Sequence, residues 1–247
     1  MSRRKVSHQT HHPESRPRLW GRHAVGAALD NPERKVLRAW ATRDAAAVMQ
    51  FPKDVPLTLA DAADLGRLVP HDAPHQGVVI DVAPLEDAWL DELIASPAER
   101  AFLLVLDQVT DPHNVGAILR SAAAFGAIGI VTQDRHSPPE SGALAKAASG
   151  ALERLPWVRV VNLARALDEI GAAGFWRIGL AGDADMQLRD ALGPKRIALV
   201  LGAEGAGLRH NTREHCDALA RMPINEAVES LNVSNAAAVA LYAASVS

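Results

Sequence analysis

The sequence predicts an α/β fold in which a parallel sheet is preceded by a smaller α/β module. The apolar run AFLLVLD at residues 101–107 is typical of a strand buried on both faces of a parallel sheet. Strand-like and helix-like segments alternate after it, as in a sheet covered by helices on both sides. The expected organisation is a basic, His-rich disordered tail (1–16), a small module (17–92), a linker (93–100) and a larger domain (101–247).

In the small module, order is expected to begin near Leu19, Trp20 and Gly21, where the first apolar side chains occur. Apolar periodicity and turn residues define its elements. We expect helices at 23–30, 43–51 and 61–69, strands at 36–42 and 77–85, and a linking helix within 86–100 that stops at Ser96-Pro97.

In the larger domain, continuous apolar runs predict strands and alanine-rich segments predict helices. The strands are expected at 101–107, 127–132, 157–161, 174–182 and 196–202, and the helices at 114–126, 141–152, 163–174 and 236–244. Asn114 lies near the start of the first of these helices, and Gly126 is expected to end it.

Charge is distributed unevenly along the chain. The net charge is −3, but residues 1–43 hold ten Lys/Arg against three Asp/Glu, and residues 44–247 hold 16 against 26. A basic arm on an acidic body is typical of a protein that contacts RNA through one end. For residues 1–16 alone, a solvated disordered tail is the favoured interpretation.

The composition excludes several classes of protein. No apolar run reaches the ~18 residues that a membrane span needs, and the N-terminus lacks the apolar segment of a secretory signal. Cys216 is the only cysteine, which excludes an internal disulfide and indicates a reducing, cytoplasmic location. Nothing around Cys216 would activate it, so a packing role is expected.

Three polar motifs stand out, and the first two follow predicted strands, where ligands bind in open α/β folds. The first runs from Asp107 through Asn114 to Arg120, an arginine among apolar neighbours. The second is the glycine-rich turn LGAEGAGL at 201–208, with Glu204 inside it; its spacing is not that of a dinucleotide site. Taken alone, each motif could be structural. Arg120 could extend its charged end from an apolar helix face into water, and the glycine-rich turn could be an ordinary loop.

The third motif is PINEAVESLNVS at 223–234, which leads into a helix of small residues. Such a helix can pass close to other backbone. Its N-terminus offers free N–H groups to a ligand, although capping is the plain role for Ser230 and Asn232.

Together, these motifs resemble those of the SpoU (TrmH-like) family of SPOUT RNA 2′-O-ribose methyltransferases. The resemblance rests on NxGxxxR at 114–120 with Phe125-Gly126, on 201–208, and on 223–234, in the family's order. The pattern LWGRHAVGAAL…HQGVV is similar to the L30e-like RNA-binding domain of rRNA-modifying members. The likeness is greatest to the RlmB-type branch, which methylates guanosine in 23S rRNA.

The resemblance implies a deep C-terminal trefoil knot, a homodimer, an RNA substrate, S-adenosylmethionine as cofactor, and neither a metal nor a membrane. It implies a site in which backbone at 202 and 222–231 holds the cofactor while polar side chains act on the ribose. The implied cofactor-binding residues are Gly202, Met222, Ile224 and Leu231, and the implied catalytic residues are Arg120, Asn114, Glu204, Ser230 and Asn232. The sequence departs from the family pattern at Glu226 and Asn235, beside the cofactor loop.

Two roles stay open for Arg120. The family assignment makes it the activator of the ribose hydroxyl. A guanidinium normally only donates hydrogen bonds, so it could instead grip a phosphate and stabilise the developing alkoxide. Alternatives also stay open for the whole protein: methylation of tRNA or of an rRNA adenosine, or an RNA-binding protein that keeps the fold without activity.

Overall fold

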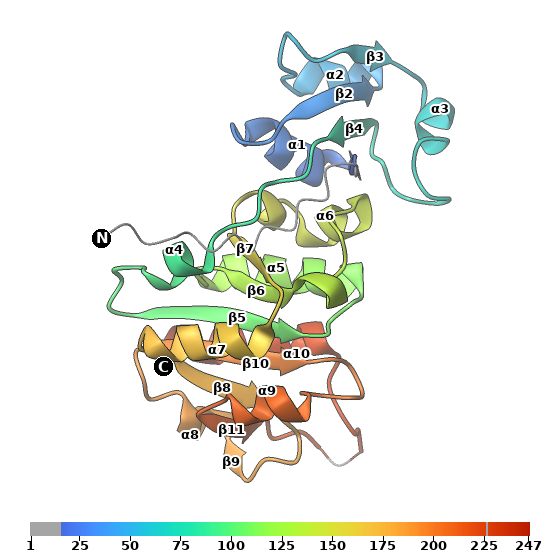
Figure 1. Cartoon of the computed structure of the whole chain (residues 1–247). Coiled ribbons are helices and arrows are strands. Elements are labelled where there is room, and N and C mark those ends of the chain that lie inside the picture. The colour runs from blue at the N-terminus through green and yellow to red at the C-terminus, as the bar shows by residue number, and fades with distance from the viewer. Residues whose placement is uncertain (1–15, 226) are drawn as a thin grey trace, which may run out of the picture.

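The computed structural model describes residues 16–225 and 227–247, which form two sheets joined through one junction (Figure 1). A four-stranded sheet near the N-terminus has the order β1-β4-β2-β3, and a seven-stranded sheet has the order β7-β6-β5-β10-β8-β11-β9. The predicted tail, apart from Arg16, and Glu226 lie outside the described residues.

The N-terminal module is mixed: β4 pairs antiparallel with β1 and β2, and β2 pairs parallel with β3. Its helices begin at polar caps where the sequence provides them, at Thr42 for α2 and Asp61 for α3. The elements are β1 (Arg18–Trp20), α1 (Arg22–Asp30), β2 (Val36–Ala41), α2 (Arg43–Val48), β3 (Leu57–Leu59), α3 (Ala62–Gly66) and β4 (Val78–Val82).

In the larger domain every pair of neighbouring strands is parallel, as the sequence predicts. Its strands are β5 (Ala101–Asp107), β6 (Ile130–Gln133), β7 (Trp157–Val160), β8 (Trp176–Leu180), β9 (Met186–Gln187), β10 (Arg196–Gly202) and β11 (Ala218–Arg221). Its helices are α4 (Leu90–Ile94), α5 (Pro112–Phe125), η1 (Asp134–His136), α6 (Gly142–Ala148), η2 (Ala151–Glu153), α7 (Leu163–Ala172), α8 (Leu188–Ala191), α9 (His210–Glu214) and α10 (Val233–Val246).

One local prediction needs correction, and one holds. The linking helix expected within 86–100 is only α4, and Leu93 packs into the core of the larger domain instead of spanning between modules. Helix α5 is capped by Asp111, whose carboxylate accepts the N–H of His113, and Pro112 takes the first helical position, so Asn114 lies near the cap as expected. Gly126 does end α5, with a left-handed φ of 81°.

The two modules share a continuous hydrophobic core. Leu19 and Val25 of the N-terminal module belong to the same buried cluster as Leu144 and Ile118 of the larger domain. The contact is close because Gly142 opens α6: a Cβ there would lie 1.9 Å from Cζ3 of Trp20. The modules therefore pack as one body, although the boundaries at residues 92 and 100 stay predictions.

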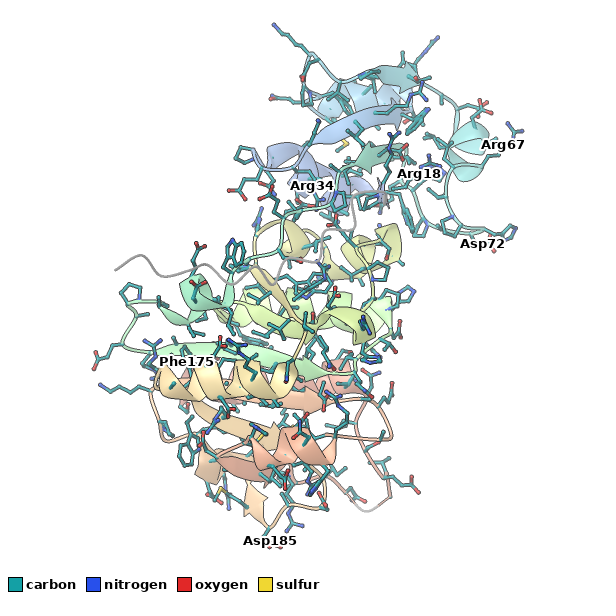
Figure 2. All side chains as sticks on the ribbon, viewed as in Figure 1. Arg18, Arg34, Arg67, Asp72, Phe175 and Asp185 are labelled. Carbon is teal, nitrogen blue, oxygen red and sulfur yellow. The ribbon has the colours of Figure 1, made fainter. Side chains whose placement is uncertain are left out.

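A buried arginine also joins the modules. Arg34 follows α1 at the junction of the two modules (Figure 2). Its side chain is fully buried between Glu140 and Glu153 of the larger domain. Its Nη1 lies 2.5 Å from Glu140 Oε1 and its Nη2 lies 2.7 Å from Glu153 Oε1. Asn31 Nδ2 adds a bond to Glu153 Oε2 at 2.9 Å. We name Arg34, Glu140 and Glu153 the junction triad.

Replacing Arg34 with methionine should strongly destabilise the chain. The substitution leaves two buried carboxylates without a counter-charge, which costs about 3–5 kcal/mol. Urea unfolding would measure the loss, with Arg43→Met on the exposed face of α2 as control, expected to change stability by about 0.5 kcal/mol or less. Equal unfolding midpoints for the two variants would contradict a structural role for the triad.

The triad also predicts a pH dependence. Burial raises the pKa of Glu140 and the nearby Glu153 adds to the rise, while Arg34 and the Leu85 N–H oppose it. A carboxyl with a raised native pKa adds stability below its ordinary pKa, and that stability is lost as pH rises through the native value. Relative to wild type, Glu140→Gln should therefore become more stable as the pH rises from the ordinary pKa of glutamate through the raised native pKa of Glu140. Unfolding curves at several pH values check this, and a pH-independent difference would refute it.

Candidate functional site at the carboxyl edge of the sheet

The site begins where β5 and β10 end side by side. These strands pair in register along their whole length, so Asp107 and Gly202 are partners at the carboxyl edge. Helix α5 and the glycine-rich turn leave the sheet from adjacent positions as a result. This is the edge at which open parallel sheets bind ligands.

The turn after β10 is tight and leaves no room for a side chain at its start. Ala203 and Gly207 exchange backbone hydrogen bonds of 3.1 and 2.8 Å. A Cβ on Gly202 would lie 2.0 Å from the carbonyl carbon of Gly207. Gly205 and Gly207 have φ of 79° and 67°, which only glycine adopts readily. The turn therefore presents backbone, with Glu204 projecting from it.

Glu204 meets two asparagines from distant parts of the chain. Asn114 Nδ2 donates to Glu204 Oε2 at 3.4 Å, and Asn232 Nδ2 donates to Glu204 Oε1 at 3.4 Å. Asn232 Nδ2 also donates to Asn114 Oδ1 at 3.1 Å. One residue from each of the three motifs thus forms a single polar cluster, which we call the Asn-Glu-Asn cluster.

Helix α10 holds the third member in place. Asn232 caps this helix by accepting the N–H of Ser234 at 2.9 Å and the Ser234 hydroxyl at 2.6 Å. Buried alanines let α10 lie against β10 and α5: Ala237, Ala240 and Ala244. The small residues of the third motif thus serve close packing, as the sequence indicated.

A buried ion pair between Asp107 and Arg209, next to the turn, was not predicted from the sequence. Asp107 is fully buried at the end of β5 and accepts from Arg209 at Nε (2.7 Å) and at the backbone N (3.1 Å). Arg209 also donates to Gln133 at 2.9 Å. The next residue, Gln108, has a positive φ of 61°. The usable signal was an acidic residue closing an apolar strand, because such a carboxylate needs a partner.

Arg120 is placed away from the Asn-Glu-Asn cluster. It follows Asn114 by six residues, which is about 9 Å and 240° along a helix, so the two side chains leave α5 on different faces. Arg120 is exposed and lines a cleft between α5 and α1. It makes no ion pair or hydrogen bond through its side chain to any residue that the structure describes.

The residues expected to contact a cofactor surround the turn. Met222 is half-buried against the main core, Leu231 is half-buried and Ile224 is exposed. Within the described chain, Ile224 and Leu231 make no backbone hydrogen bonds, so their N–H and C=O groups are available to a ligand. Ser230 is exposed and has no hydrogen bond to another described residue. In residues 16–225 and 227–247, no three His, Cys, Asp or Glu residues group as metal ligands.

Comparisons with known proteins define the class and then the family. A family model described as RNA 2′-O ribose methyltransferase substrate binding matches residues 18–88, and one described as the SpoU rRNA methylase family matches residues 101–242. Fold, turn and matches together define a ribose methyltransferase with a substrate-binding module. The chain belongs to the SpoU rRNA methylase family.

Individual relatives match nearly the whole chain. The 23S rRNA (guanosine-2′-O-)-methyltransferases RlmB of Pseudomonas syringae pv. tomato and Pseudomonas aeruginosa are 39% and 40% identical, covering 92% and 91% of this chain and 94% of each relative. The solved SpoU methyltransferase AviRb of Streptomyces viridochromogenes, in complex with AdoMet, superposes with a TM-score of 0.77 at 25% identity, covering 92% of this chain and 88% of AviRb. The predicted α/β SPOUT fold is confirmed, and the knot itself stays a prediction.

No helix in the described ranges is long and apolar enough to cross a bilayer.

Cys216 should be unreactive in the folded protein. Burial raises the pKa of its thiol to about 12, although Arg177 opposes the rise, and its Sγ lies 3.3 Å from the Thr212 carbonyl. Almost no thiolate, the reactive form, is present at pH 8. Iodoacetamide labelling followed by mass spectrometry should show modification only after unfolding in urea. Rapid stoichiometric labelling of the native protein would exclude the packing role.

Proposed function

We propose that this protein transfers a methyl group from S-adenosylmethionine to the 2′-hydroxyl of a guanosine ribose in 23S rRNA. Family membership supports the reaction class, and the activity of relatives about 40% identical over 94% of their length supports the nucleotide and the RNA. The observation that carries the proposal is the Asn-Glu-Asn cluster, in which all three family motifs meet beside a turn of bare backbone.

The residues present fit the cofactor. The turn at 202–208 folds so tightly on itself that no side chain fits at Gly202, and among the described residues the backbone groups of Ile224 and Leu231 make no hydrogen bonds. Gly202, Met222, Ile224 and Leu231 would hold the adenosyl and methionine parts, mainly through backbone. When bound, S-adenosylmethionine supplies a methyl group on a positively charged sulfur, which is already activated for transfer.

Within this site the protein's contribution is positioning and charge. Asn114 and Asn232 fix the Glu204 carboxylate, which leaves it lone pairs to accept a hydroxyl hydrogen bond from the substrate ribose. Ser230, exposed beside them, offers a further hydroxyl. Placing the sugar oxygen in line with the methyl group supplies much of the rate enhancement in such reactions.

Arg120 completes the site from the partner subunit of a homodimer. Its guanidinium stays charged and can only donate, so its role is to bind the substrate phosphate and to stabilise the oxyanion that forms as the 2′-hydroxyl loses its proton. On its own protomer it lies on a different face of α5 from Asn114. A second copy related by a two-fold axis would bring it to the other cluster.

An exposed apolar face of α10 supports the dimer. Val239, Tyr242 and Val246 are 49%, 57% and 65% exposed and recur at helical spacing along α10. The Tyr242 ring meets Phe125 of α5 edge-on, 5.8 Å between centroids, so the two helices form one surface. Contiguous exposed apolar side chains mark an interaction site. We assign this face to the second copy of the chain.

Replacing Arg120 with alanine should abolish methylation and leave the fold intact, because the side chain is exposed and unpaired within the described chain. Transfer of tritium from labelled S-adenosylmethionine to unmethylated 23S rRNA measures the activity. Arg165→Ala is the control: Arg165 is an exposed arginine of α7 whose one ion pair among the described residues is with Glu169 on its own helix. Near-normal turnover by Arg120→Ala would remove this residue from the mechanism.

The shared site makes a sharper prediction. Arg120→Ala and Glu204→Ala protomers should each be inactive as homodimers, and a mixed dimer should recover activity because one of its two sites holds both residues. Co-expression with two different affinity tags isolates the mixed dimer. A mixed dimer as inactive as its parents, with its dimeric state confirmed by sedimentation, would place Arg120 and Glu204 in the same protomer's site.

A further inference from the structure

The cleft that contains Arg120 extends well beyond the residues proposed for the reaction. Its volume is about 640 Å³, and it lies between α1 of the N-terminal module and α5, α6 and η2 of the larger domain. Arg22 and His23 line the first wall, and Arg120 and Arg154 line the second. The two modules therefore contribute cationic side chains to the same space.

The charge of this cleft is strongly positive for a chain whose net charge is −3. Three arginines face it against a single carboxylate, Asp30. Arg22, Arg120 and Arg154 form no ion pair with an acidic residue in the described ranges, and the Arg22 side chain bonds only to the Gln76 carbonyl, at 3.4 Å. Unpaired arginines on two sides of one cleft are suited to an anion with several charges.

The rest of the lining is small and apolar. Alanines and glycines of α1, α5, α6 and η2 form much of its floor and walls: Gly26, Ala27, Ala123, Ala124, Ala148 and Ala151. Gly150 sits at a left-handed φ of 93°, and a Cβ there would lie 3.0 Å from the Ala27 Cβ, so α1 approaches this turn closely. A floor without long side chains leaves room for sugars between the charged groups.

The junction triad fixes the position of α1 relative to η2, and so the positions of the two walls of the cleft. Glu153 is buried and binds Arg34 and Asn31 at the C-terminal end of α1, while its neighbour in sequence, Arg154, is exposed to the cleft. The position of Arg154 relative to Arg22 is thus set by buried contacts between the modules. The cleft is a preformed feature of the fold, which reduces the entropy lost when it binds a ligand.

We propose that this cleft is a subsite for the RNA backbone, in which Arg22 and Arg154 bind phosphates of the strand that continues from the target nucleotide at Arg120. The inference rests on the proposed function and deepens it by assigning substrate contacts to two residues outside the three motifs. The ligand that fits is a phosphodiester chain. It carries one negative charge per nucleotide, and the cleft presents several arginines in succession. Arg22 and Arg154 determine affinity and register, and they take no part in the methyl transfer itself.

The test compares Arg22→Ala, Arg154→Ala and the double variant with wild type. Each lost phosphate contact should weaken binding of in-vitro-transcribed, unmethylated 23S rRNA by about tenfold at low salt. The slope of log K against log salt should become shallower by about 0.7–0.9 per contact. KM for RNA should rise much more than kcat falls, and S-adenosylmethionine binding by calorimetry should not change.

Two further variants separate a phosphate contact from a structural role. Arg154→Lys keeps the charge and should recover most of the affinity lost in Arg154→Ala. Arg189→Ala removes an exposed arginine of α8, near the far edge of the sheet, and should leave the salt slope unchanged. Inorganic phosphate, added as a competitor, should displace RNA only at concentrations far above that of the RNA, since it supplies the anion without the strand.

The outcomes distinguish this subsite from the proposed function. If wild type methylates rRNA and the double variant matches Arg189→Ala in KM and salt slope, the subsite is wrong and the proposed function stands. If the double variant loses RNA affinity with a shallower slope but wild type never transfers a methyl group, the subsite stands and the proposed function is wrong. Equal displacement by phosphate and by RNA would overturn the assignment to a strand.

Discussion

The in-register pairing of β5 with β10 is the constraint on which the site depends. It makes Asp107 and Gly202 neighbours, so the helix bearing Asn114 and the turn bearing Glu204 leave the sheet together. Both strands are apolar on both faces, and hydrophobic pattern alone would tolerate a shift in register. Asp107 reduces that tolerance: it is fully buried and needs a partner, and in the observed register Arg209 reaches it from beyond the turn. A buried ion pair therefore fixes the geometry of an exposed polar cluster.

A second buried charge group determines how the modules are oriented. Burying Arg34 with two carboxylates gains little stability compared with apolar side chains of similar size, because three charges lose their hydration. What it adds is specificity, since the alternative orientations of the module would leave those charges unpaired. The shared apolar core supplies the attraction between modules, and the junction triad selects one arrangement of it. That arrangement sets the width and the charge of the cleft beside Arg120.

The sequence was sufficient for the architecture and for much of the site. Long apolar runs such as 101–107 and 196–202 predicted the central strands at their observed positions. Strands β1, β3, β9 and β11, with two to four residues each, were missed because so short a run carries no periodicity. The meeting of Asn114, Glu204 and Asn232 could be anticipated only through the family resemblance, since their contacts span about half the chain. The Arg209–Asp107 pair and the junction triad depend on tertiary packing, which local patterns do not encode.

The separation of Arg120 from the Asn-Glu-Asn cluster has a physical rationale. A guanidinium beside Glu204 on the same protomer would form an ion pair, and both groups would then be less available to a substrate. Glu204 instead has two neutral amides as neighbours, which orient the carboxylate without neutralising it. Arg120 stands on an alanine-rich face with other arginines nearby, where no carboxylate except Asp30 competes for it. Assembly of the site from two subunits would keep the Arg120 guanidinium and the Glu204 carboxylate apart until RNA binds between them. Each group would then contact the substrate and would not be neutralised by the other.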